Sequence, residues 1–383
     1  MKSTQRVTKR LADVAEVVTG STPSTFCPEY YGGEIPFVGP SDLGNTEPIL
    51  TAPKTLTPVG AKQARVLPQG AVLVCCIGAT IGKIGIAGRP LATNQQINAL
   101  VFDERVIWPR YGFYFCMMLE PTIRGFGTST TLPILPKSRF QELLISFPHM
   151  EEQRRIADIL DKADAIRRKR KQAIALTDQL LRSTFLEMFG DPVTNPKGFS
   201  SAILADVAVF RSGDFLPARA MDKDGIYPVY GGNGITGFHG SYMFQEPMVV
   251  IGRVGVYCGA THLTKEKSWI TDNALYIASM SPSLTKTYLY HALVKANLNQ
   301  YASQSAQPLI SGSRIGQIPM LIPPLPVQGR FEELVRRHDS LSMRQRQSEE
   351  YATQLFSALA DRSFRGELTR TEPAGRQLSM FNK

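Results

Sequence analysis

The stretch PHMEEQRRIADILDKADAIRRKRKQAIALTDQLLRSTFLEMFGDP, residues 148–192, has the pattern of one long helix. Glu151 and Glu152 follow a proline at its start, where free N–H groups and the helix dipole favour negative charge. Gly190-Asp191-Pro192 is typical of a helix end. The apolar residues between lie mostly on one stripe: Ile156, Leu160, Ala163, Ile166, Ala173, Ile174, Leu180, Leu181 and Phe185. A helix over about residues 151–186 would be roughly 54 Å long, which is typical of a spacer.

The chain contains an internal repeat. LADVA at residues 11–15 recurs at 204–208, and Asn-Ala-Leu at 98–100 recurs at 273–275. From Pro133 onward the two halves align without a gap, and the identical residues are Pro133, Ser138, Arg139, Pro148, Gln153 and Arg155, matching Pro308, Ser313, Arg314, Pro323, Gln328 and Arg330. The pattern predicts a tandem duplication of a globular unit plus a long helix.

The second long helix is expected to start after residues 323–326. Its apolar stripe is patchier than that of the first: Phe331, Leu334, Val335, His338, Leu341, Tyr351, Leu355, Leu359 and Phe364. Because a single stripe on a lone helix would face water, we expect the two helices to pack on each other as a coiled coil. If the halves are related by a pseudo-twofold, the helices run antiparallel.

Each globular unit has the pattern of an α/β (α+β) domain. Short β-rich runs are bounded by Gly, Pro and Asn, and a helical stretch follows at around 110–119 in the first unit and 284–298 in the second. The expected strands lie at 71–76, 84–87, 99–102, 248–251 and 274–278. The tail after about residue 370 lacks periodicity and is expected to be loose.

Length and composition predict a multi-domain protein with a polyanionic partner. The 383 residues exceed one ordinary core, and the formal charge of +10 is spread along the chain, as suits a protein that follows a duplex. No apolar run is long enough for a bilayer and the N-terminus lacks a signal-peptide core, so we expect a cytoplasmic protein without membrane contact. Five cysteines without CxxC spacing predict buried or incidental thiols.

Motifs for catalysis or metal binding are absent or weak in the sequence. There is no NPPY- or DPPY-like tetrapeptide of a DNA adenine methyltransferase. GATIGKI at 78–84 is too short for a phosphate-binding loop and predicts a strand-turn-strand, and GNGITG at 232–237 predicts a Gly/Asn-rich loop. Asp222 and Asp224 predict a solvated turn, and the histidines lack metal-ligand spacing. We therefore expect no catalytic residue, no metal and no cofactor bound by this chain.

The order and duplication of several motifs resemble the specificity subunits of type I restriction-modification enzymes over about residues 9–370. The motifs of the first half are VTGSTPS (18–24), GEIPFVGPSDL (33–43), IGATIGK (77–83), ATNQQ (92–96) and PHMEEQRRIADIL (148–160). Those of the second half are YPVYGGNGITGF (227–238), IGRVGVYCG (251–259), WITDNAL (269–275), SAQPLISGSR (305–314) and SFRGEL (363–368). One departure is that residues 326–331 lack the acidic pair of the first helix.

The resemblance implies a non-catalytic subunit that directs an adenine methyltransferase and ATP-dependent endonuclease complex to DNA. Target recognition domains at 1–148 and 191–324 would each read one half of a bipartite, asymmetric site. Helical spacers at 149–190 and 325–370 would set the spacing and dock two modification subunits, and a tail would occupy 371–383. S-adenosylmethionine, ATP and Mg would be used by modification and restriction subunits, with double-stranded DNA as the shared partner.

Basic and amide side chains in or near the loops are the candidates for DNA contact, since arginine and lysine bind both phosphate and guanine. For phosphate or guanine the candidates are Lys62, Arg65, Lys83, Arg139, Arg253 and Arg314, and for base edges Gln95, Thr130, Asn233, His239 and Gln307. Each could instead be an ordinary surface or turn residue. Arg139 and Arg314 match across the repeat, which fits either DNA contact or a structural ion pair.

The basic run Arg167, Arg168, Lys169, Arg170 and Lys171 interrupts the apolar stripe of the first helix. A solvated face, DNA contact and contact with an acidic patch of a modification subunit are all open interpretations. For the whole chain, two other hypotheses stand beside the specificity subunit: a stand-alone sequence-specific DNA-binding regulator, and a catalytic protein with an unrecognised site.

Overall fold

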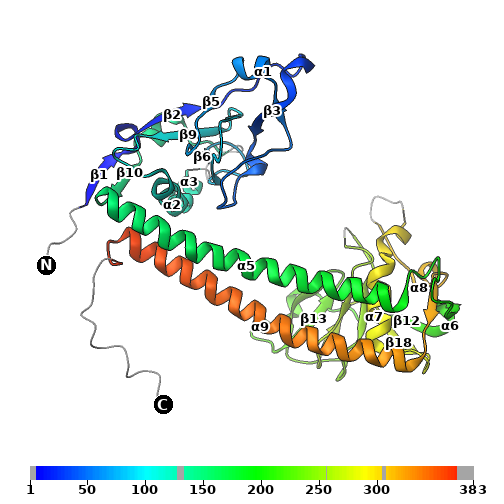
Figure 1. Ribbon diagram of the computed structural model, residues 1–383. Coiled ribbons are helices and arrows are strands. Elements are labelled where there is room, and N and C mark those ends of the chain that lie inside the picture. The colour runs from blue at the N-terminus through cyan, green and yellow to red at the C-terminus, as the bar shows by residue number, and fades with distance from the viewer. Residues whose placement is uncertain (1–5, 127–132, 256, 304–307, 369–383) are drawn as a thin grey trace. The chain divides into compact units, whose positions relative to one another are not determined.

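The computed structural model describes residues 6–126, 133–255, 257–303 and 308–368 (Figure 1). The chain divides into two compact units. The first unit comprises Met1–Lys171 and Gln347–Lys383, and the second unit comprises Gln172–Arg346. Both long helices cross this division, so each unit contains a part of each helix.

The two long helices are α5, Met150–Phe189, and α9, Leu325–Phe364. Each has 40 residues, or about 60 Å at 1.5 Å per residue. The glutamates predicted to favour the start of the first helix lie in the first turn of α5, and Gly190 ends it with a φ of +77°, which glycine adopts without strain. Both predicted helices are therefore confirmed.

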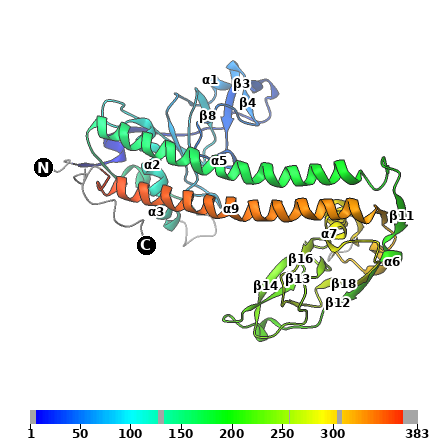
Figure 2. The same cartoon turned by 60° about the horizontal axis from the view of Figure 1, so that its bottom comes forward.

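The two helices run antiparallel and pack together in each unit (Figures 1 and 2). In the first unit, Ile156 and Leu160 of α5 and Phe356 of α9 enter one core, and the Arg167 guanidinium lies over the Phe356 ring at 4.8 Å. In the second unit, Phe185 of α5 lies 5.3 Å from Phe331 of α9 between ring centroids. The predicted antiparallel pairing is confirmed.

Part of the predicted apolar stripe is not buried. Ile166 and Leu180 of α5 are 49% and 66% exposed, and Leu334, Leu341, Tyr351 and Leu355 of α9 are also exposed. The prediction that these six side chains face the helix pair was wrong, because the interface is narrower than the stripe drawn from sequence spacing.

The first unit is built on two four-stranded sheets and a strand pair. The sheet orders are β2-β9-β6-β7 and β4-β3-β8-β5, with β1 paired to β10. All pairs are antiparallel except β3 with β8. The strands are β1 Val7–Arg10, β2 Ala15–Thr19, β3 Tyr31–Val38, β4 Thr55–Leu56, β5 Val66–Leu67, β6 Val72–Cys75, β7 Ile84–Ile86, β8 Leu91–Thr93, β9 Ile97–Phe102 and β10 Leu144–Phe147.

The helices of the first unit besides α5 and α9 are short, apart from α2. They are α1 Pro58–Lys62, α2 Pro109–Met118, α3 Glu120–Gly125 and α4 Lys137–Gln141, with 3-10 turns at Leu11–Asp13, Pro28–Tyr30 and Pro40–Asp42. The β2 sheet, α2 and the long helices enclose the main core, in which Phe113, Tyr114 and Phe140 are fully buried.

The second unit repeats this arrangement. Its sheet orders are β12-β18-β15-β16 and β14-β13-β17, with β11 paired to β19, and β13 with β17 is again the parallel pair. The strands are β11 Ser200–Ile203, β12 Ala208–Ser212, β13 Tyr227–Gly231, β14 Gly234–His239, β15 Val249–Gly252, β16 Thr261–Leu263, β17 Trp269–Ile270, β18 Ala274–Met280 and β19 Pro319–Ile322. The remaining elements are α6 Leu204–Val207, α7 Lys286–Ala296, α8 Gly312–Ile315 and 3-10 turns at Ala218–Ala220 and Leu298–Tyr301.

A buried glutamine ties the first turn of each long helix to its own globular unit. Gln153 is 1% exposed. Its Oε1 accepts the N–H of Trp108, the N-cap residue of α2, at 2.9 Å. Its Nε2 donates to the carbonyls of Val106 at 2.9 Å and Pro148 at 3.0 Å.

Gln328, its counterpart in α9, makes the same three bonds. It is fully buried and its Oε1 accepts the N–H of Thr285, the N-cap residue of α7, at 2.7 Å. Its Nε2 donates to the carbonyls of Ser283 at 2.8 Å and Pro323 at 2.7 Å. We call each set of three bonds a glutamine clamp. The repeat predicted from sequence thus extends to individual hydrogen bonds.

Candidate nucleic-acid interface

In the first unit, two of the predicted DNA-contact residues meet at the loop after β2. Thr22 Oγ1 donates to Gln95 Oε1 at 2.6 Å. Arg65 is held to the same loop, since its main-chain N–H donates to Ser21 Oγ at 3.1 Å and its Nη1 donates to the Thr19 carbonyl at 2.6 Å. Arg65 and Gln95 are both exposed. The loop therefore presents a cation and an amide side by side.

Two further loops of the first unit adjoin this one. Gly20 packs so closely that an added Cβ would lie 2.1 Å from the Asn94 carbonyl. The turn between β6 and β7 is fixed by Gly78, whose N–H donates to the Pro133 carbonyl at 2.8 Å. The predicted strand-turn-strand at 78–84 is confirmed. Gln96 Nε2 donates to the Ile77 carbonyl at 3.5 Å, so the loops at 20–22, 77–82 and 94–96 form one cluster.

The second unit builds an equivalent cluster. Gly232, in the β13–β14 turn, lies so close to Gly252 that a Cβ added to Gly252 would lie 2.1 Å from the carbonyl oxygen of Gly232. The Arg253 N–H donates to the Asn273 carbonyl at 2.9 Å, and its Nη1 donates to Ser212 Oγ at 3.3 Å. Asn233 is exposed at the tip of the turn. The predicted Gly/Asn-rich loop is confirmed only at residues 232–233, because Gly234 already begins strand β14 of a hairpin. Asn233 and Arg253 belong to neighbouring loops.

The two arginines that match across the repeat are both exposed. Arg139 on α4 and Arg314 on α8 both face solvent. Within the described residues neither side chain forms an ion pair. Of the two alternatives that the sequence left open for these arginines, the structural ion pair is therefore not formed within the described residues.

The remaining predicted contacts are scattered. Lys62 is exposed at the end of α1, and Lys83 is half-buried beside Gly44. His239 ends β14 against Trp269, with ring centroids 5.4 Å apart, so it lies about 20 Å along the strand from Asn233. Thr130 and Gln307 lie outside the described residues. The structure does not bring His239 to the loop cluster of its unit.

The basic run of α5 separates into two groups. Asp164 is fully buried and accepts from Arg167 at 2.7 Å and Arg168 at 2.8 Å, and the Thr46 hydroxyl also donates to it. Arg168 is further paired with Glu47. A buried carboxylate needs such partners, so these two arginines have a structural role. The other three, Lys169, Arg170 and Lys171, are exposed.

The described residues hold no group of three or more His, Cys, Asp and Glu arranged to bind a metal. The five cysteines are free thiols, and burial raises the pKa of the Cys76 thiol to about 12, so it stays protonated at neutral pH. Asp222 accepts the N–H of Asp224 at 2.9 Å within a turn, as predicted.

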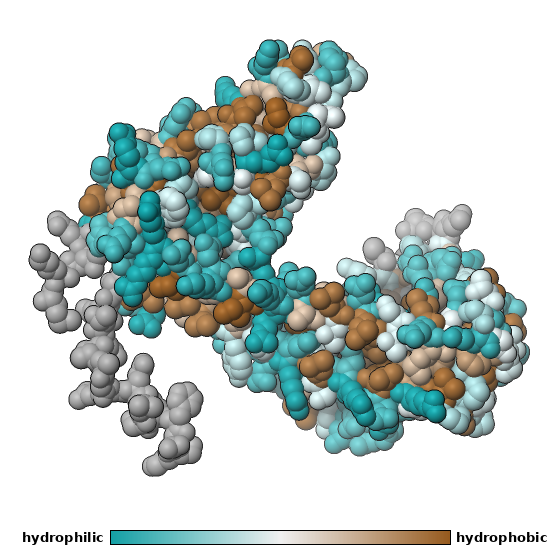
Figure 3. Space-filling model, viewed as in Figure 1, coloured by the Kyte–Doolittle hydropathy of each residue, from teal (hydrophilic) through white to brown (hydrophobic). Residues whose placement is uncertain are grey.

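The long helices carry apolar side chains on their free surface. Figure 3 shows hydrophobic residues among hydrophilic ones along α9. Those exposed on α5 are Ile166, Leu176, Leu180 and Leu186, and on α9 Leu334, Leu341, Met343, Tyr351 and Leu355. Leu176 and Leu180 on α5 are four residues apart, as are Tyr351 and Leu355 on α9, so each pair lies on one side of its helix.

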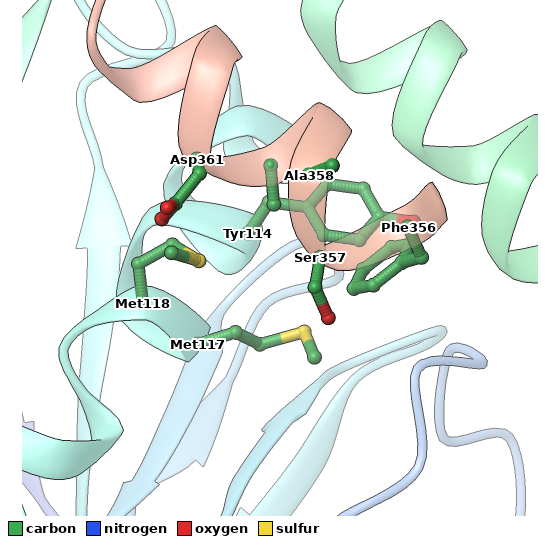
Figure 4. A pocket seen from close by; sticks show the side chains of 8 residues that line it. Tyr114, Met117, Met118, Phe356, Ser357, Ala358 and Asp361 are labelled. Atoms are coloured by element: carbon green, nitrogen blue, oxygen red, sulfur yellow. The ribbon is translucent and has the colours of Figure 1, made fainter. Parts of the chain in front are cut away.

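A mainly apolar groove of about 340 Å³ is lined by α2 and α9 in the first unit (Figure 4). Tyr114, Met117 and Met118 line it from α2, while Phe356 and Ala358 line it from α9. Methionine side chains adapt to different shapes and are common in surfaces that receive apolar partners.

Two non-identical copies of one loop-bearing domain alternate with two long helices along the chain. The chain belongs to the family of the type I restriction modification DNA specificity domain, whose model matches residues 5–176 and 196–349. This confirms the resemblance seen in the motifs. The protein is the DNA specificity subunit of a type I restriction-modification system and is itself non-catalytic.

Curated relatives and solved structures agree with this family. The chain is 26% identical to the EcoprrI specificity subunit of Escherichia coli over 87% of both chains. It is 30% identical to the MjaIX specificity subunit of Methanocaldococcus jannaschii over 56% of this chain and 54% of that one. In fold it is similar to the S subunit from M. genitalium, with a TM-score of 0.61, 16% identity and coverage of 95% and 97%. Among the described residues no helix has the length and apolarity needed to cross a bilayer.

Proposed function

We propose that the recognition domains at 1–148 and 191–324 each read one half of a bipartite, asymmetric DNA site. The observation that carries this proposal is the duplicated loop cluster. The two clusters share main-chain hydrogen bonds, from Gly20 to Ile97 and Gly78 to Pro133 in the first and from Gly213 to Ala274 and Gly255 to Pro308 in the second. Their side chains differ: Arg65 and Gln95 are presented in one, and Arg253 and Asn233 in the other. A duplex is nearly symmetric in its backbone and asymmetric in its bases, so equivalent frames with different side chains suit two different half-sites.

Phosphate contacts would fix the register of each domain. The candidates are the matched pair Arg139 and Arg314, which are exposed and free of ion pairs within the described residues, together with Lys62 and Lys83. Since phosphate contacts carry no sequence information, the same residue type can occupy the equivalent position in both domains.

The spacers at 149–190 and 325–370 would set the distance between half-sites and dock two modification subunits. Exposed apolar side chains along α5 and α9 support protein docking there. The modification subunits would use S-adenosylmethionine to methylate adenines, and restriction subunits would use ATP and Mg to cleave DNA in the cytoplasm.

Co-expression with a modification subunit tests the proposal. The two proteins should co-purify stoichiometrically, and the complex should bind one bipartite sequence and methylate adenines within it. Mapping methylated adenines in the host genome would identify that sequence. A chain that binds one DNA sequence equally well without a partner would instead support the stand-alone regulator, and methyl transfer by the pure chain would contradict the non-catalytic assignment.

A further inference from the structure

Two phenylalanines stand out from the surface of the globular units. Phe26 is 94% exposed and Phe215 is 73% exposed. A buried phenylalanine side chain is stabilised by roughly 1.5–3 kcal/mol relative to an exposed one. Folding therefore leaves a large apolar ring in water in each unit.

The two phenylalanines occupy related loops of the repeat. Phe26 follows β2 and Phe215 follows β12, and each loop starts with a glycine, Gly20 or Gly213. The glycine N–H donates to the carbonyl of the central strand of its sheet, Ile97 at 3.0 Å or Ala274 at 3.1 Å.

Both loops are held in place by hydrogen bonds. In the first unit the Tyr31 hydroxyl donates to the Pro23 carbonyl at 2.8 Å, and the Cys27 N–H donates to the Ser24 carbonyl at 3.3 Å. In the second, the Asp214 N–H donates to the Ile270 carbonyl at 3.0 Å. An ordered loop thus presents each ring to solvent.

An arginine lies at the base of each loop. Arg65 donates to the Thr19 carbonyl at the end of β2, and Arg253 donates to Ser212 Oγ at the end of β12. Ser24 and Thr25, beside Phe26, are polar and exposed. An exposed ring on a loop whose first strand binds an arginine fits a nucleic acid, which offers both base faces and phosphates, better than a protein partner, which would need a contiguous apolar patch.

We propose that Phe26 and Phe215 contact DNA bases, one in each half-site, by stacking on a base or inserting between two base steps. Apolar side chains inserted in this way unstack the step and make its deformability part of the recognition. The inference rests on the proposal that each domain reads one half-site. It adds a specificity-determining aromatic residue to each loop cluster.

The test uses the full chain assembled with its modification subunits and a duplex carrying the site found by methylation mapping. 2-Aminopurine, placed in turn at positions of each half-site, reports unstacking through its fluorescence. Phe26→Ala should abolish the signal in one half-site only, and Phe215→Ala in the other. Affinity should fall roughly 5- to 150-fold, since stacking on an aromatic ring is worth about 1–3 kcal/mol per base.

Two kinds of control separate stacking from general damage. Phe26→Trp and Phe215→Trp should keep the fluorescence signal and the affinity. Leu144→Ala and Ile226→Ala remove apolar side chains that are 58% and 74% exposed elsewhere in the same units, and should change neither.

Three results would overturn the inference. The first is an affinity within twofold of the wild type and an unchanged fluorescence signal in both alanine variants. The second is a loss of co-purification with the modification subunit, which would assign the rings to a protein contact. The third is a wild-type assembly without site-specific DNA binding, which would also overturn the proposed function.

Discussion

The glutamine clamps should contribute strongly to the stability of each unit. Replacing Gln153 or Gln328 with leucine keeps most of the volume and removes three buried hydrogen bonds. At about 1 kcal/mol per bond, and more for an N–H left without a partner, each variant should lose roughly 3–5 kcal/mol. For a unit of this size that corresponds to a fall in Tm of roughly 6–20 °C.

The two tryptophans allow each unit to be measured separately. Trp108 lies in the first unit and Trp269 in the second. Thermal unfolding of Gln153→Leu is followed by Trp108 fluorescence in a Trp269→Phe background, and Gln328→Leu by Trp269 fluorescence in a Trp108→Phe background. Gln179→Leu, at an exposed position of α5, is the control and should have little effect.

Substitution by glutamate gives a sharper version of the same test. A carboxylate at position 153 can still accept the Trp108 N–H, but it cannot donate to the carbonyls of Val106 and Pro148. Gln153→Glu should therefore also destabilise the first unit at neutral pH. Losses below about 1 kcal/mol, or a large loss for only one of the two clamps, would refute the reasoning, because both clamps make the same bonds.

Three other perturbations follow from the structure. Changing Lys169, Arg170 and Lys171 to glutamine should reduce the slope of log affinity for DNA against log salt concentration by up to about 3, if each neutralises one phosphate; an unchanged slope would rule out DNA contact by these three residues. The double variant Arg167→Gln/Arg168→Gln should instead lower the free energy of unfolding by roughly 3–5 kcal/mol, because it leaves the Asp164 carboxylate without a cation. Burial lowers the pKa of His291 to about 4, so as pH falls the unfolded state binds a proton at His291 before the folded state does. The free energy of unfolding that is present above pH 6.5 should therefore fall by about 2 kcal/mol at pH 5. Unfolding followed by Trp269 fluorescence would show this, and a His291→Phe variant with the same pH dependence would refute it. Inserting one helical turn after Ala173 should lengthen the gap between half-sites by about 5 Å, read from the methylated motif, while changed half-sites would show that the helix does more than set distance.

The local parts of the fold could be predicted from sequence. The long helices, the strand runs such as 71–76 and 274–278 and the hairpin at 78–84 were predicted, because periodicity and turn residues act over a few positions. The repeat could be found because matched residues such as Gln153 and Gln328 keep their spacing. The clamps themselves were missed, although this identity across the repeat was their signal.

Contacts between distant segments could not be predicted in this way. Arg167 and Arg168 pair with Asp164 at i,i+3 and i,i+4 spacing on the same helix, which the sequence could have indicated. The contact of Asp164 with Thr46 could not be predicted, because Thr46 lies 118 positions earlier in the chain. His239 was predicted to contact base edges from a loop, but it ends strand β14, whose extended backbone carries it away from Asn233. The exposure of Phe26 and Phe215 depends on loop conformations that composition does not encode.

The clamps also affect how freely the recognition domains can diverge. Each glutamine bonds only to main-chain N–H and carbonyl groups of its domain, and every residue type except proline supplies both. The join between domain and helix therefore imposes almost no sequence requirement on the domain. Recombination could exchange the gene segment of one domain for a segment that encodes a different domain. The new domain would still pack on the same helix, provided that its backbone follows the same path before the helix equivalent to α2.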